Sequence, residues 1–335
     1  MKRFFLFLLV CTFFQITVCS QQGMTVMFFN VENLFDPEDD PLKDDDAYTP
    51  EGDYHWTRSR YWSKLDAISK VIVAADEEQA PVLVGLAEVE NDTVLRDLTA
   101  RSALRETEYR YIMTDSPDRR GIDVALLYRR SFFRLIGKES LRVNLRPYGG
   151  GATRDILHVT GQLETNDTLD IYVCHWPSRY GGTDETEQFR MCAAGVVRCS
   201  VDSIFSVRRK PYIIIMGDLN DGPDAPALRD GLKAYPFASV SILKDCELVT
   251  VMDAVEQGSY KYQGEWDTYD QFVVSASLVN GKGCTEFLGT EVMHLPFLLT
   301  DDDSYGGVKP FRTYNGRRYQ GGYSDHLPIR MRIGY

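Results

Sequence analysis

Polar side chains follow most of the short apolar runs in this 335-residue chain, and their types suit chemistry on a phosphate group. Carboxylates, amides and imidazoles at the ends of buried strands tend to converge at one edge of a sheet. One such residue alone is a weak signal, because an Asp or a His after a strand is more often a turn or rim residue. Here the series is Asn30, Glu32, Glu88, His175, Asp218, Asn220, Asp325 and His326.

These residues offer oxygen and nitrogen ligands but no thiolate, a set that favours Mg²⁺, Mn²⁺ or Ca²⁺ over zinc. A cation of this kind neutralises phosphate oxygens, while a carboxylate orients or deprotonates water and a histidine transfers protons near neutral pH. Hydrolysis of a phosphoester needs all of these parts. We therefore expect a metal-dependent hydrolase that uses Mg²⁺ or Mn²⁺.

The apolar runs before these residues are rich in β-branched and aromatic side chains, which is typical of strands. Two segments instead repeat apolar residues every three or four positions and predict helices, over residues 62–72 and 185–207. Strands and helices alternate without a linker or an internal repeat, so we expect a single α/β domain over residues 21–335. The predicted strands are Met24–Val31, Val82–Ala87, Val124–Tyr128, Ile156–Leu163, Leu169–Cys174, Tyr212–Met216, Phe272–Val274 and Ile329–Ile333.

The composition is that of an ordinary globular protein, and the formal net charge of −12 excludes a strongly basic nucleic-acid coat. Residues 1–20 place Lys2 and Arg3 before an apolar run and end in small residues. This pattern predicts a signal peptide cleaved before Gln21, and therefore a secreted or periplasmic protein. Lipid attachment at Cys19 is the less favoured interpretation. No later apolar run is long enough to span a bilayer.

Two segments stand out by charge. Residues 36–46 are rich in Asp and Glu; a solvated loop is favoured, and a calcium-binding loop is the alternative, although the acids lack the spacing of an EF-hand. Residues 304–324 contain no acid, and basic residues alternate there with aromatic ones. This segment is either a platform for phosphates and bases or a Gly-rich hairpin with an exposed tip. Its basic residues are Lys309, Arg312, Arg317 and Arg318.

The cysteines do not form a disulfide framework. The chain has seven, of which Cys11 and Cys19 lie in or beside the predicted signal peptide, and the remaining odd number is widely spaced. Cys192 and Cys199 fall about 10 Å apart along a predicted helix, too far to pair. No pair has the C-x-x-C spacing of a zinc or redox motif.

Six short blocks contain most of the residues named above. They are FNVENLF at 29–35, LAEVEN at 86–91, GIDVALLY at 121–128, HWPS at 175–178, GDLND at 217–221 and SDHLP at 324–328. In this order the blocks resemble those of the endonuclease/exonuclease/phosphatase superfamily, over nearly the whole chain from Met24 onward. Within it the chain looks most like bacterial secreted nuclease-like members.

The resemblance implies a four-layered α/β sandwich, in which two mixed β-sheets pack face to face and are flanked by helices. It also implies a metal site. Glu88 matches the principal metal-ligand carboxylate, and Asn30, Glu32 and Asp325 are expected near the ion. The ion is expected to be Mg²⁺ or Mn²⁺, with Ca²⁺ as the alternative.

The resemblance further implies a catalytic set. Asp218 and Asn220 match the pair that orients the attacking water and holds the phosphate. His326 matches the catalytic histidine, and its carboxylate partner is expected to be Asp270, with Asp267 as the rival.

His175 matches a second histidine, which contacts the phosphate or protonates the leaving group, and Asp123 is a weak candidate for its orienting carboxylate. Arginines in loops beside the blocks are candidates to grip phosphate, and an aromatic side chain after His175 is a candidate to stack on a base or sugar. Together with one arginine of the basic segment, these substrate-binding candidates are Arg119, Arg154, Arg179, Arg312 and Tyr180.

The superfamily acts on several phosphoesters, so the fold and site do not fix the substrate. A nuclease that hydrolyses DNA or RNA by in-line attack of water is the first hypothesis. A phosphodiesterase or phosphatase for small or lipid phosphoesters is the second. A non-catalytic binding module is the third, and it would require a broken set of site residues. We expect a monomer with a nucleic acid substrate and no protein partner.

Overall fold

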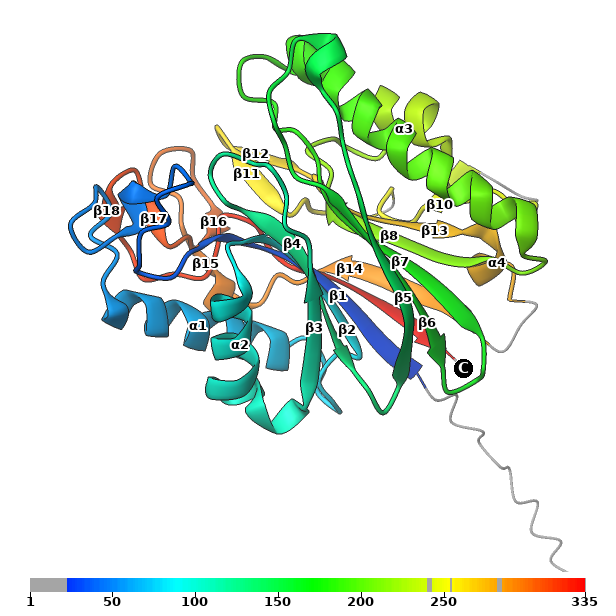
Figure 1. Ribbon diagram of the computed structural model, residues 1–335, viewed down its shortest axis with the longest axis horizontal. Helices are drawn as coiled ribbons and strands as arrows, with labels where there is room; N and C mark the ends of the chain where they lie inside the picture. The colour runs from blue at the N-terminus through cyan, green and yellow to red at the C-terminus, as the bar shows by residue number, and fades with distance from the viewer. Residues whose placement is uncertain (1–22, 240–242, 254, 282–284, 335) are drawn as a thin grey trace, which may run out of the picture.

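The computed structural model describes residues 23–334, apart from 240–242, 254 and 282–284. Two large sheets lie face to face, and helices cover their outer faces (Figure 1). The four-layered α/β sandwich expected from the sequence is therefore confirmed. The predicted signal peptide and Cys19 lie outside the described residues, and so does Cys284.

The first sheet has six strands. They are β1 (Gly23–Leu34), β2 (Leu83–Val89), β3 (Tyr109–Met113), β4 (Asp123–Arg129), β14 (Glu286–Val292) and β19 (Ile329–Gly334). Their order across the sheet is β14-β19-β1-β2-β4-β3. Strand β1 is central and is buried along almost its whole length, because most of its residues are apolar. It runs parallel to β2, so the carboxyl ends of both strands lie at one edge of the sheet.

The second sheet has seven strands. They are β5 (Phe133–Leu141), β6 (Ile156–Leu163), β7 (Thr168–His175), β8 (Tyr212–Asp218), β9 (Ala234–Pro236), β10 (Leu248–Thr250) and β13 (Asp270–Ser275). Their order is β5-β6-β7-β8-β13-β10-β9. Strands β7 and β8 are parallel, and β13 runs antiparallel to β8. The carboxyl ends of β7 and β8 therefore meet the beginning of β13.

The helices cover the two outer faces of the sandwich (Figure 1). They are α1 (Arg58–Val73), α2 (Asp92–Arg101), α3 (Thr183–Val207) and the short α4 (Ala276–Val279). Helices α1 and α2 lie on the first sheet, and their first turns are capped by the side chains of Thr57 and Asn91. Helix α3 packs on the second sheet. Shorter helical turns span Asp46–Tyr48, Ala103–Thr107, Arg146–Tyr148, Ala227–Leu232, Phe237–Ser239 and Pro296–Leu298.

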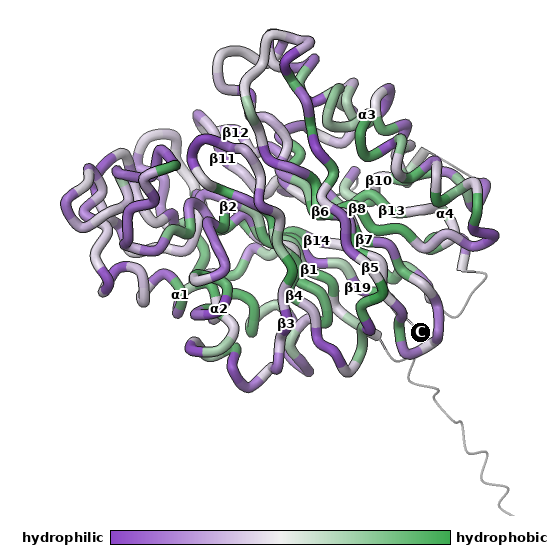
Figure 2. Tube along the Cα trace, viewed as in Figure 1, coloured by the Kyte–Doolittle hydropathy of each residue, from purple (hydrophilic) through white to green (hydrophobic). Residues whose placement is uncertain are grey.

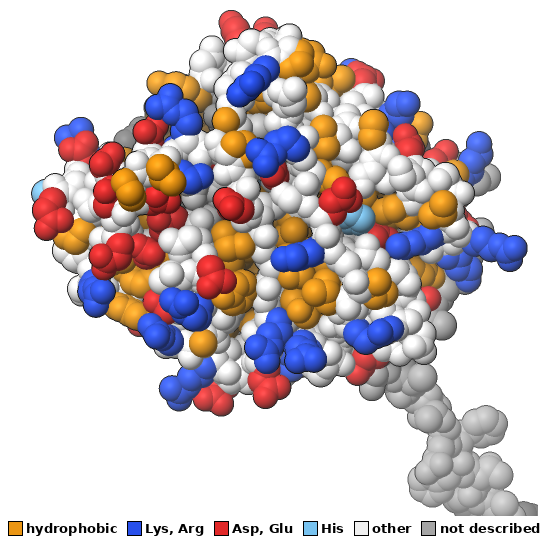
Figure 3. All heavy atoms as spheres, in the orientation of Figure 1, with side chains coloured by type: hydrophobic (Ala, Val, Ile, Leu, Met, Phe, Trp, Pro, Cys, Tyr) orange, Lys and Arg blue, Asp and Glu red, His pale blue; other side chains and the backbone are white. Residues whose placement is uncertain are grey.

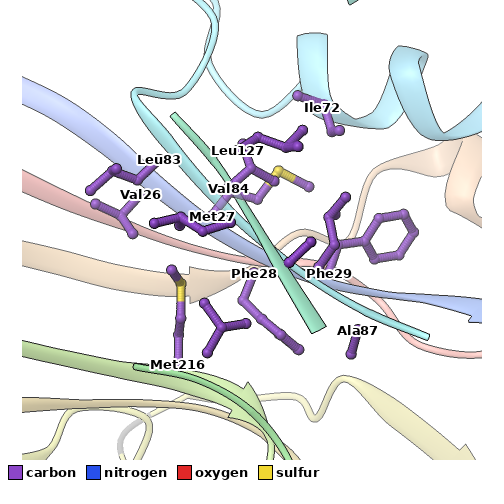
Figure 4. Close-up of a cluster of buried hydrophobic side chains, with 14 of the residues drawn as sticks. Val26, Met27, Phe28, Phe29, Ile72, Leu83, Val84, Ala87, Leu127 and Met216 are labelled. Atoms are coloured by element: carbon purple, nitrogen blue, oxygen red, sulfur yellow. The ribbon is translucent and has the colours of Figure 1, made fainter. Parts of the chain in front are cut away.

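Apolar side chains fill the spaces between these layers. One cluster lies between the sheets and beneath α1 and α2, and another lies between the second sheet and α3; the central strands are correspondingly hydrophobic in Figure 2. Between the sheets Phe28 points toward Met216, whereas Ile72 of α1 lies on the opposite face of the first sheet (Figure 4). Gly85 is required at this point, since a Cβ there would lie 2.9 Å from Met216 Sδ and 3.0 Å from the Phe28 ring.

Three small hairpins extend from the sandwich. They pair β11 (Tyr260–Tyr262) with β12 (Glu265–Asp267), β15 (Leu299–Asp301) with β16 (Val308–Pro310), and β17 (Tyr314–Asn315) with β18 (Arg318–Tyr319). The loop of residues 35–57 lies beside the β17–β18 hairpin (Figure 1), and the rings of Tyr54 and Tyr314 are 4.8 Å apart across this junction. The segment 304–324 therefore contains a hairpin, with Gly316 at its turn in a left-handed conformation (φ 58°).

The eight predicted strands and both predicted helices are present, most of them extended by a few residues at their ends. Among the described residues no helix has the length and apolar character needed to cross a membrane. Four cysteines fall in the described part of the chain, and all of them are free thiols: Cys174, Cys192, Cys199 and Cys246. The sequence had excluded only the pairing of Cys192 with Cys199.

Candidate active site

Irregular backbone at the carboxyl ends of β1 and β2 shapes one side of the site. The pairing register shifts after Asn30, so that residues 31–33 stand opposite the single residue Glu88. Glu32, Asn33 and Glu88 have positive φ angles of 52°, 53° and 65°. Non-glycine residues adopt this conformation at a cost, and such strain concentrates at functional sites. The bulge redirects these side chains away from the regular alternation of the strand.

Three neighbouring strands of the second sheet supply the opposite side. His175 at the end of β7 is the register partner of Asp218 at the end of β8. Asp218 in turn stands opposite Asp270, the first residue of β13. All three side chains are buried. The register of these strands thus places two carboxylates and an imidazole side by side.

The two halves meet in one centre that joins the sheets. Asn30 Nδ2 donates a hydrogen bond of 3.0 Å to Asp218 Oδ2 and lies 3.4 Å from Glu88 Oε1. His175 Nε2 lies 3.8 Å from Glu88 Oε1 and 3.7 Å from Asp218 Oδ2. The backbone N–H of Asn33 donates to Glu88 Oε2 at 2.8 Å. Residues from β1, β2, β7 and β8 therefore share one cluster of polar atoms.

His326, in the loop before β19, completes this cluster. Its Nδ1 lies 2.7 Å from Asp270 Oδ2, an oxygen that also accepts a hydrogen bond from the Ser259 hydroxyl. Its other ring nitrogen, Nε2, lies 3.7 Å from Asp218 Oδ2. Asp267 instead lies on β12, opposite Tyr260. Of the two carboxylates considered from the sequence, the structure places Asp270 against the imidazole.

The environment separates the protonation states of these groups. Burial, reinforced by the neighbouring Asp270, raises the pKa of Asp218 to about 7 despite the opposing effect of His326. Burial alone would lower the pKa of His326, but the Asp270 and Asp218 carboxylates outweigh it and hold that pKa well above the usual range. Burial, followed by the Arg154 guanidinium, keeps the pKa of His175 well below its usual range. At neutral pH the site has one charged and one neutral imidazole.

The donor atoms fit a hard divalent cation. Ligand atoms of Asp218, Asp270 and His326 lie within 4.8 Å of one another, and the Glu88 carboxylate and Asn30 amide lie beside Asp218. Asp270 Oδ1 is buried with no hydrogen-bond partner among the described residues. Because Asp270 already binds His326, we assign the ion to the Glu88 and Asn30 side of Asp218. Carboxylate oxygens are ligands that Mg²⁺ and Mn²⁺ prefer, whereas the Asn30 amide turns its N–H₂ group toward Asp218 and its oxygen accepts a hydrogen bond of 3.1 Å from the Glu32 backbone N–H.

Two other predicted ligands are paired with protein cations. Arg312 donates to Glu32 Oε1 at 3.2 Å and to Asp325 Oδ2 at 2.9 Å, and the Thr313 backbone N–H donates to Glu32 Oε2 at 2.7 Å. Burial lowers the pKa of Lys64 to about 8, opposed by the nearby Glu32 and Asp325 carboxylates. Arg312, predicted to bind substrate, is thus part of an ion-paired group with the predicted ligands Glu32 and Asp325.

Asn220 lies directly beside the Asp218 carboxylate. Its backbone N–H donates to Asp218 Oδ1 at 3.0 Å, and its side-chain Nδ2 donates to the Trp176 carbonyl at 3.1 Å. Its φ angle of 52° is left-handed, which an asparagine tolerates better than most residues. Two anchors therefore fix the amide at the rim of the site.

A buried ion-pair group that the sequence did not reveal holds this loop. Arg179 donates to the Asn220 carbonyl and to Asp221 Oδ1, both at 2.8 Å, and Arg190 donates to Asp221 Oδ2 at 2.7 Å. Arg179, predicted to grip phosphate, is therefore used in part to position Asn220. Arg190 is fully buried on the apolar face of α3. Its place in that apolar stripe was the one sequence signal for this role.

Three predicted substrate contacts lie around the cluster and not in it. Arg119 is 80% exposed at its side chain and pairs with Asp44. Tyr180 is 94% exposed. Arg154 is the opposite case, because it is buried and ion-paired with Asp118 at 3.2 Å. The charge of Arg154 nonetheless helps to lower the pKa of the His175 imidazole, after the larger effect of burial.

The weak assignment of Asp123 to His175 is wrong. Asp123 accepts hydrogen bonds from the Thr114 hydroxyl and the Ser116 backbone N–H, so its carboxylate is committed to the turn before β4. His175 Nδ1 is buried and has no hydrogen-bond partner among the described residues. The sequence missed this because a position inside a matched block does not specify the direction of the side chain.

The basic segment 304–324 offers few unpaired cations. Lys309 lies 3.4 Å from Asp302, Arg317 lies 2.7 Å from Asp53, and Arg312 is paired as described above. On the face in Figure 3, basic side chains are scattered and form no continuous stripe. These pairings favour the hairpin interpretation of the segment over a phosphate platform.

The acidic segment 36–46 does not assemble a calcium site among the described residues, where the one set of three metal-ligating groups is that of Asp218, Asp270 and His326. Glu90 instead accepts a hydrogen bond from the Asp36 backbone N–H. Burial raises the pKa of Glu90 to about 8. Within the segment, the backbone N–H groups of Glu38 and Leu42 donate to the side chains of Asp36 and Asp40. These bonds are typical of a surface loop.

A family model described as "Endonuclease/Exonuclease/phosphatase family" matches residues 25–334. The chain therefore belongs to the endonuclease/exonuclease/phosphatase family, whose members hydrolyse phosphoesters. This confirms the resemblance drawn from the six sequence blocks. No curated protein matches the sequence.

Solved structures with the same fold include proteins of different stated activities. A functionally unknown conserved protein from Enterococcus faecalis V583 is 14% identical, with a TM-score of 0.59 over 93% of this chain and 100% of that chain. A mannosyl-6-phosphatase from Bacteroides thetaiotaomicron VPI-5482 is 15% identical, with a TM-score of 0.58 over 93% and 100%. TDP2 from D. rerio, complexed with single strand DNA product, is 13% identical, with a TM-score of 0.55 over 93% and 99%. At these identities the likeness concerns the fold alone.

Proposed function

We propose that this chain is a secreted, metal-dependent phosphodiesterase whose first candidate substrate is nucleic acid. The observation that carries the proposal is the single cluster in which Asp218 lies between Asn30, His175 and His326, with His326 bonded to Asp270. It combines a cation site, a carboxyl group that titrates near neutral pH and two imidazoles of opposite charge state. These are the parts that hydrolysis of a phosphoester requires.

The residues have distinct roles in this mechanism. When bound, the divalent cation neutralises the phosphate oxygens, and Glu88 is the residue that would hold it, with Asn30 beside it. Asp218 orients water opposite the leaving oxygen and accepts its proton, and its position beside His175 and His326 suits both tasks. The imidazolium of His326, held by Asp270, hydrogen-bonds to the phosphoryl oxygen on which charge develops. His175 contacts the phosphate or the leaving oxygen.

A small phosphoester is the second candidate substrate, and one observation favours it. Three of the four cations of the basic segment, Lys309, Arg312 and Arg317, are paired with acids, whereas a long polyanion is normally bound through several free Lys and Arg side chains. Nucleic acid stays first because a member of the fold is described with a single-stranded DNA product. The mannosyl-6-phosphatase of the same fold supports the second candidate.

The decisive experiment measures hydrolysis by residues 21–335 with Mg²⁺ or Mn²⁺. Plasmid DNA, bis-p-nitrophenyl phosphate and a panel of phosphomonoesters and lipid phosphoesters are compared, with His326→Ala as the control. Plasmid nicking that is lost in the variant supports a nuclease. Turnover of a small or lipid ester with intact plasmid supports the second candidate. If the wild-type protein hydrolyses none of these substrates, both candidate activities are contradicted and a non-catalytic binding module is favoured.

Secretion is part of the proposal and rests on the sequence of residues 1–20. Expression of the whole chain in a Gram-negative host, followed by mass measurement of the exported protein, tests it. A mature N-terminus at Gln21 is expected. A product that starts at Cys19 with an added lipid mass would instead support the lipoprotein alternative.

A further inference from the structure

An enclosed pocket opens beside the catalytic cluster, between the loop of residues 35–57 and the β17–β18 hairpin. Its volume is about 310 Å³. The tyrosines Tyr48, Tyr54 and Tyr314 line it together with the polar side chains of Glu32, Asn33 and Arg312. We call this the aromatic pocket. None of the roles assigned so far explains why three tyrosine rings gather at this position.

The walls of the aromatic pocket are held in place from behind. The Tyr48 and Tyr54 rings stack with centroids 4.7 Å apart, and the Tyr54 and Tyr314 rings meet at 4.8 Å. Trp56 is fully buried next to them and donates its indole N–H to a backbone carbonyl at 2.9 Å. Arg60 donates to the carbonyl of Tyr54 at 2.7 Å. A pocket fixed in this way is preorganised for a ligand.

The aromatic pocket adjoins the Glu88 carboxylate through Asn33. Asn33, which lines the pocket, donates its backbone N–H to Glu88 at 2.8 Å. Glu32 and Arg312 line the pocket and are bonded to each other at 3.2 Å. Burial, reinforced by nearby groups that include the Glu88 and Glu32 carboxylates, raises the pKa of Tyr48 above its ordinary value. A group in this pocket therefore lies next to a phosphate held at Glu88.

We propose that the aromatic pocket binds the sugar ring that is esterified to the scissile phosphate. This inference rests on the proposed hydrolysis at the adjacent site. The volume lies at the small end of the range for ligand pockets, about 300 to 1,000 Å³, which suits one ring and not a chain of several residues. The Tyr48 ring is stacked by Phe35 at 4.4 Å and by Tyr54 at 4.7 Å, so Tyr54 and Tyr314 are the rings left to pack against the apolar face of a sugar. A carboxylate, a guanidinium and an amide match its hydroxyl groups.

Nucleotides and sugar phosphates both contain such a ring. The experiment therefore has to distinguish a nucleotide from a sugar phosphate as the ligand. Three p-nitrophenyl phosphodiesters have the same leaving group and differ in the second alcohol esterified to the phosphate. They are the p-nitrophenyl esters of thymidine 5′-phosphate, glucose 6-phosphate and methyl phosphate. Phenyl p-nitrophenyl phosphate adds a flat ring without hydroxyl groups. Release of p-nitrophenol reports kcat/KM for each. The more efficient of the two sugar esters identifies the source.

Tyr54→Ala removes one wall of the aromatic pocket. We expect it to lower kcat/KM about tenfold for the two sugar esters, through KM, and to leave the methyl and phenyl esters unchanged within about twofold. Tyr235→Ala is the matched control, because Tyr235 is 47% exposed on β9 at the far edge of the second sheet. This control is expected to leave all four esters unchanged.

Gly316→Asn provides a second variant that removes no packing. Gly316 lines the aromatic pocket at φ 58°, a conformation that asparagine tolerates, and a Cβ there would meet no atom within 4 Å. The added side chain is expected to obstruct the binding of the sugar esters and not of the methyl ester. The pocket assignment can therefore be tested with this variant even if Tyr54→Ala does not fold.

Equal losses on the methyl and sugar esters in both variants, or no loss on any ester, would overturn the assignment. A loss on the phenyl ester as large as that on the sugar esters would also overturn it, in favour of a flat aromatic ligand. If the wild-type protein hydrolyses no ester, the proposed function fails and calorimetry decides the pocket separately. Glucose 6-phosphate and thymidine 5′-phosphate should then bind the wild type at least about tenfold more tightly than either variant, with inorganic phosphate unaffected; equal affinities refute the pocket.

Discussion

The bond between His326 and Asp270 provides the sharpest test of the catalytic assignment. Asp270→Asn keeps the size of the side chain and removes its charge. Asp270 Oδ2 lies 2.7 Å from His326 Nδ1, and the carboxylate is the first of the groups that raise the pKa of this imidazole. A hydrogen bond to a charged partner is about twice as strong as a neutral one. The variant imidazole therefore loses most of its preference for the charged form.

The expected effect on turnover is large and the effect on folding is small. A positioned imidazole contributes about 10²- to 10⁴-fold, so we expect kcat to fall about 10²- to 10³-fold, or about 3 to 4 kcal/mol. The loss of stability should be smaller, because removing the Asp270 charge weakens the pairing with His326 but also relieves the buried carboxyl of Asp218, whose pKa Asp270 raises. Asp270→Asn thus separates catalysis from stability.

The assay is steady-state hydrolysis of bis-p-nitrophenyl phosphate between pH 5 and 9, alongside thermal unfolding. Ser259→Ala is the matched control, since it removes a neutral donor to the same Asp270 oxygen and leaves the charge; less than about a tenfold loss is expected. Wild-type kcat in Asp270→Asn would refute the reasoning. An equal loss in Ser259→Ala would show that packing, and not the charge, matters.

Two further predictions concern the divalent cation and the buried carboxyl group of Glu90. Glu88→Gln should weaken Mn²⁺ binding measured by calorimetry at least about tenfold and abolish the activity that EDTA removes, whereas Glu291→Gln, on the edge strand β14, should change neither; equal Mn²⁺ affinities would move the ion elsewhere. Burial raises the pKa of Glu90 to about 8 from an ordinary 4.5, so its contribution to stability is complete below pH 4.5 and is lost as the pH rises through 8. Between pH 5 and 8 the wild-type protein should lose on the order of 2 to 4 kcal/mol of unfolding free energy relative to Glu90→Gln in urea titrations, and parallel pH curves would disprove this.

The fold could be predicted where burial is complete. The run Tyr212–Met216 is apolar at every position because β8 is covered on both faces, so the sequence alone identifies it as a strand. Strand β5 was missed since it lies at the edge of the second sheet and most of Phe133–Leu141 is exposed and polar. Edge strands need no continuous apolar pattern, and propensity alone does not reveal them.

The identities of the residues in the candidate site could be predicted, but their pairings could not. Asp218 and His326 were identifiable because each follows or precedes an apolar run in a matched block. The left-handed backbone at Glu88 depends on a register shift between two strands, which no local pattern encodes. The ion pair of Arg312 with Glu32 joins residues almost the whole chain apart. Such partners are set by tertiary packing, and they decide which charges stay free for a substrate.

The site is assembled across the seam between the two sheets. Asn30 and Glu88 belong to the first sheet, and Asp218 belongs to the second. Their separation depends on how closely the sheets approach, and the close packing of Gly85 with Met216 and Phe28 is one of the contacts between the sheets. The distances within the cluster of polar side chains therefore depend on the distance between the two sheets. Substitutions deep in the core, with no contact to any substrate, can tune the reaction by moving the two halves a few tenths of an ångström.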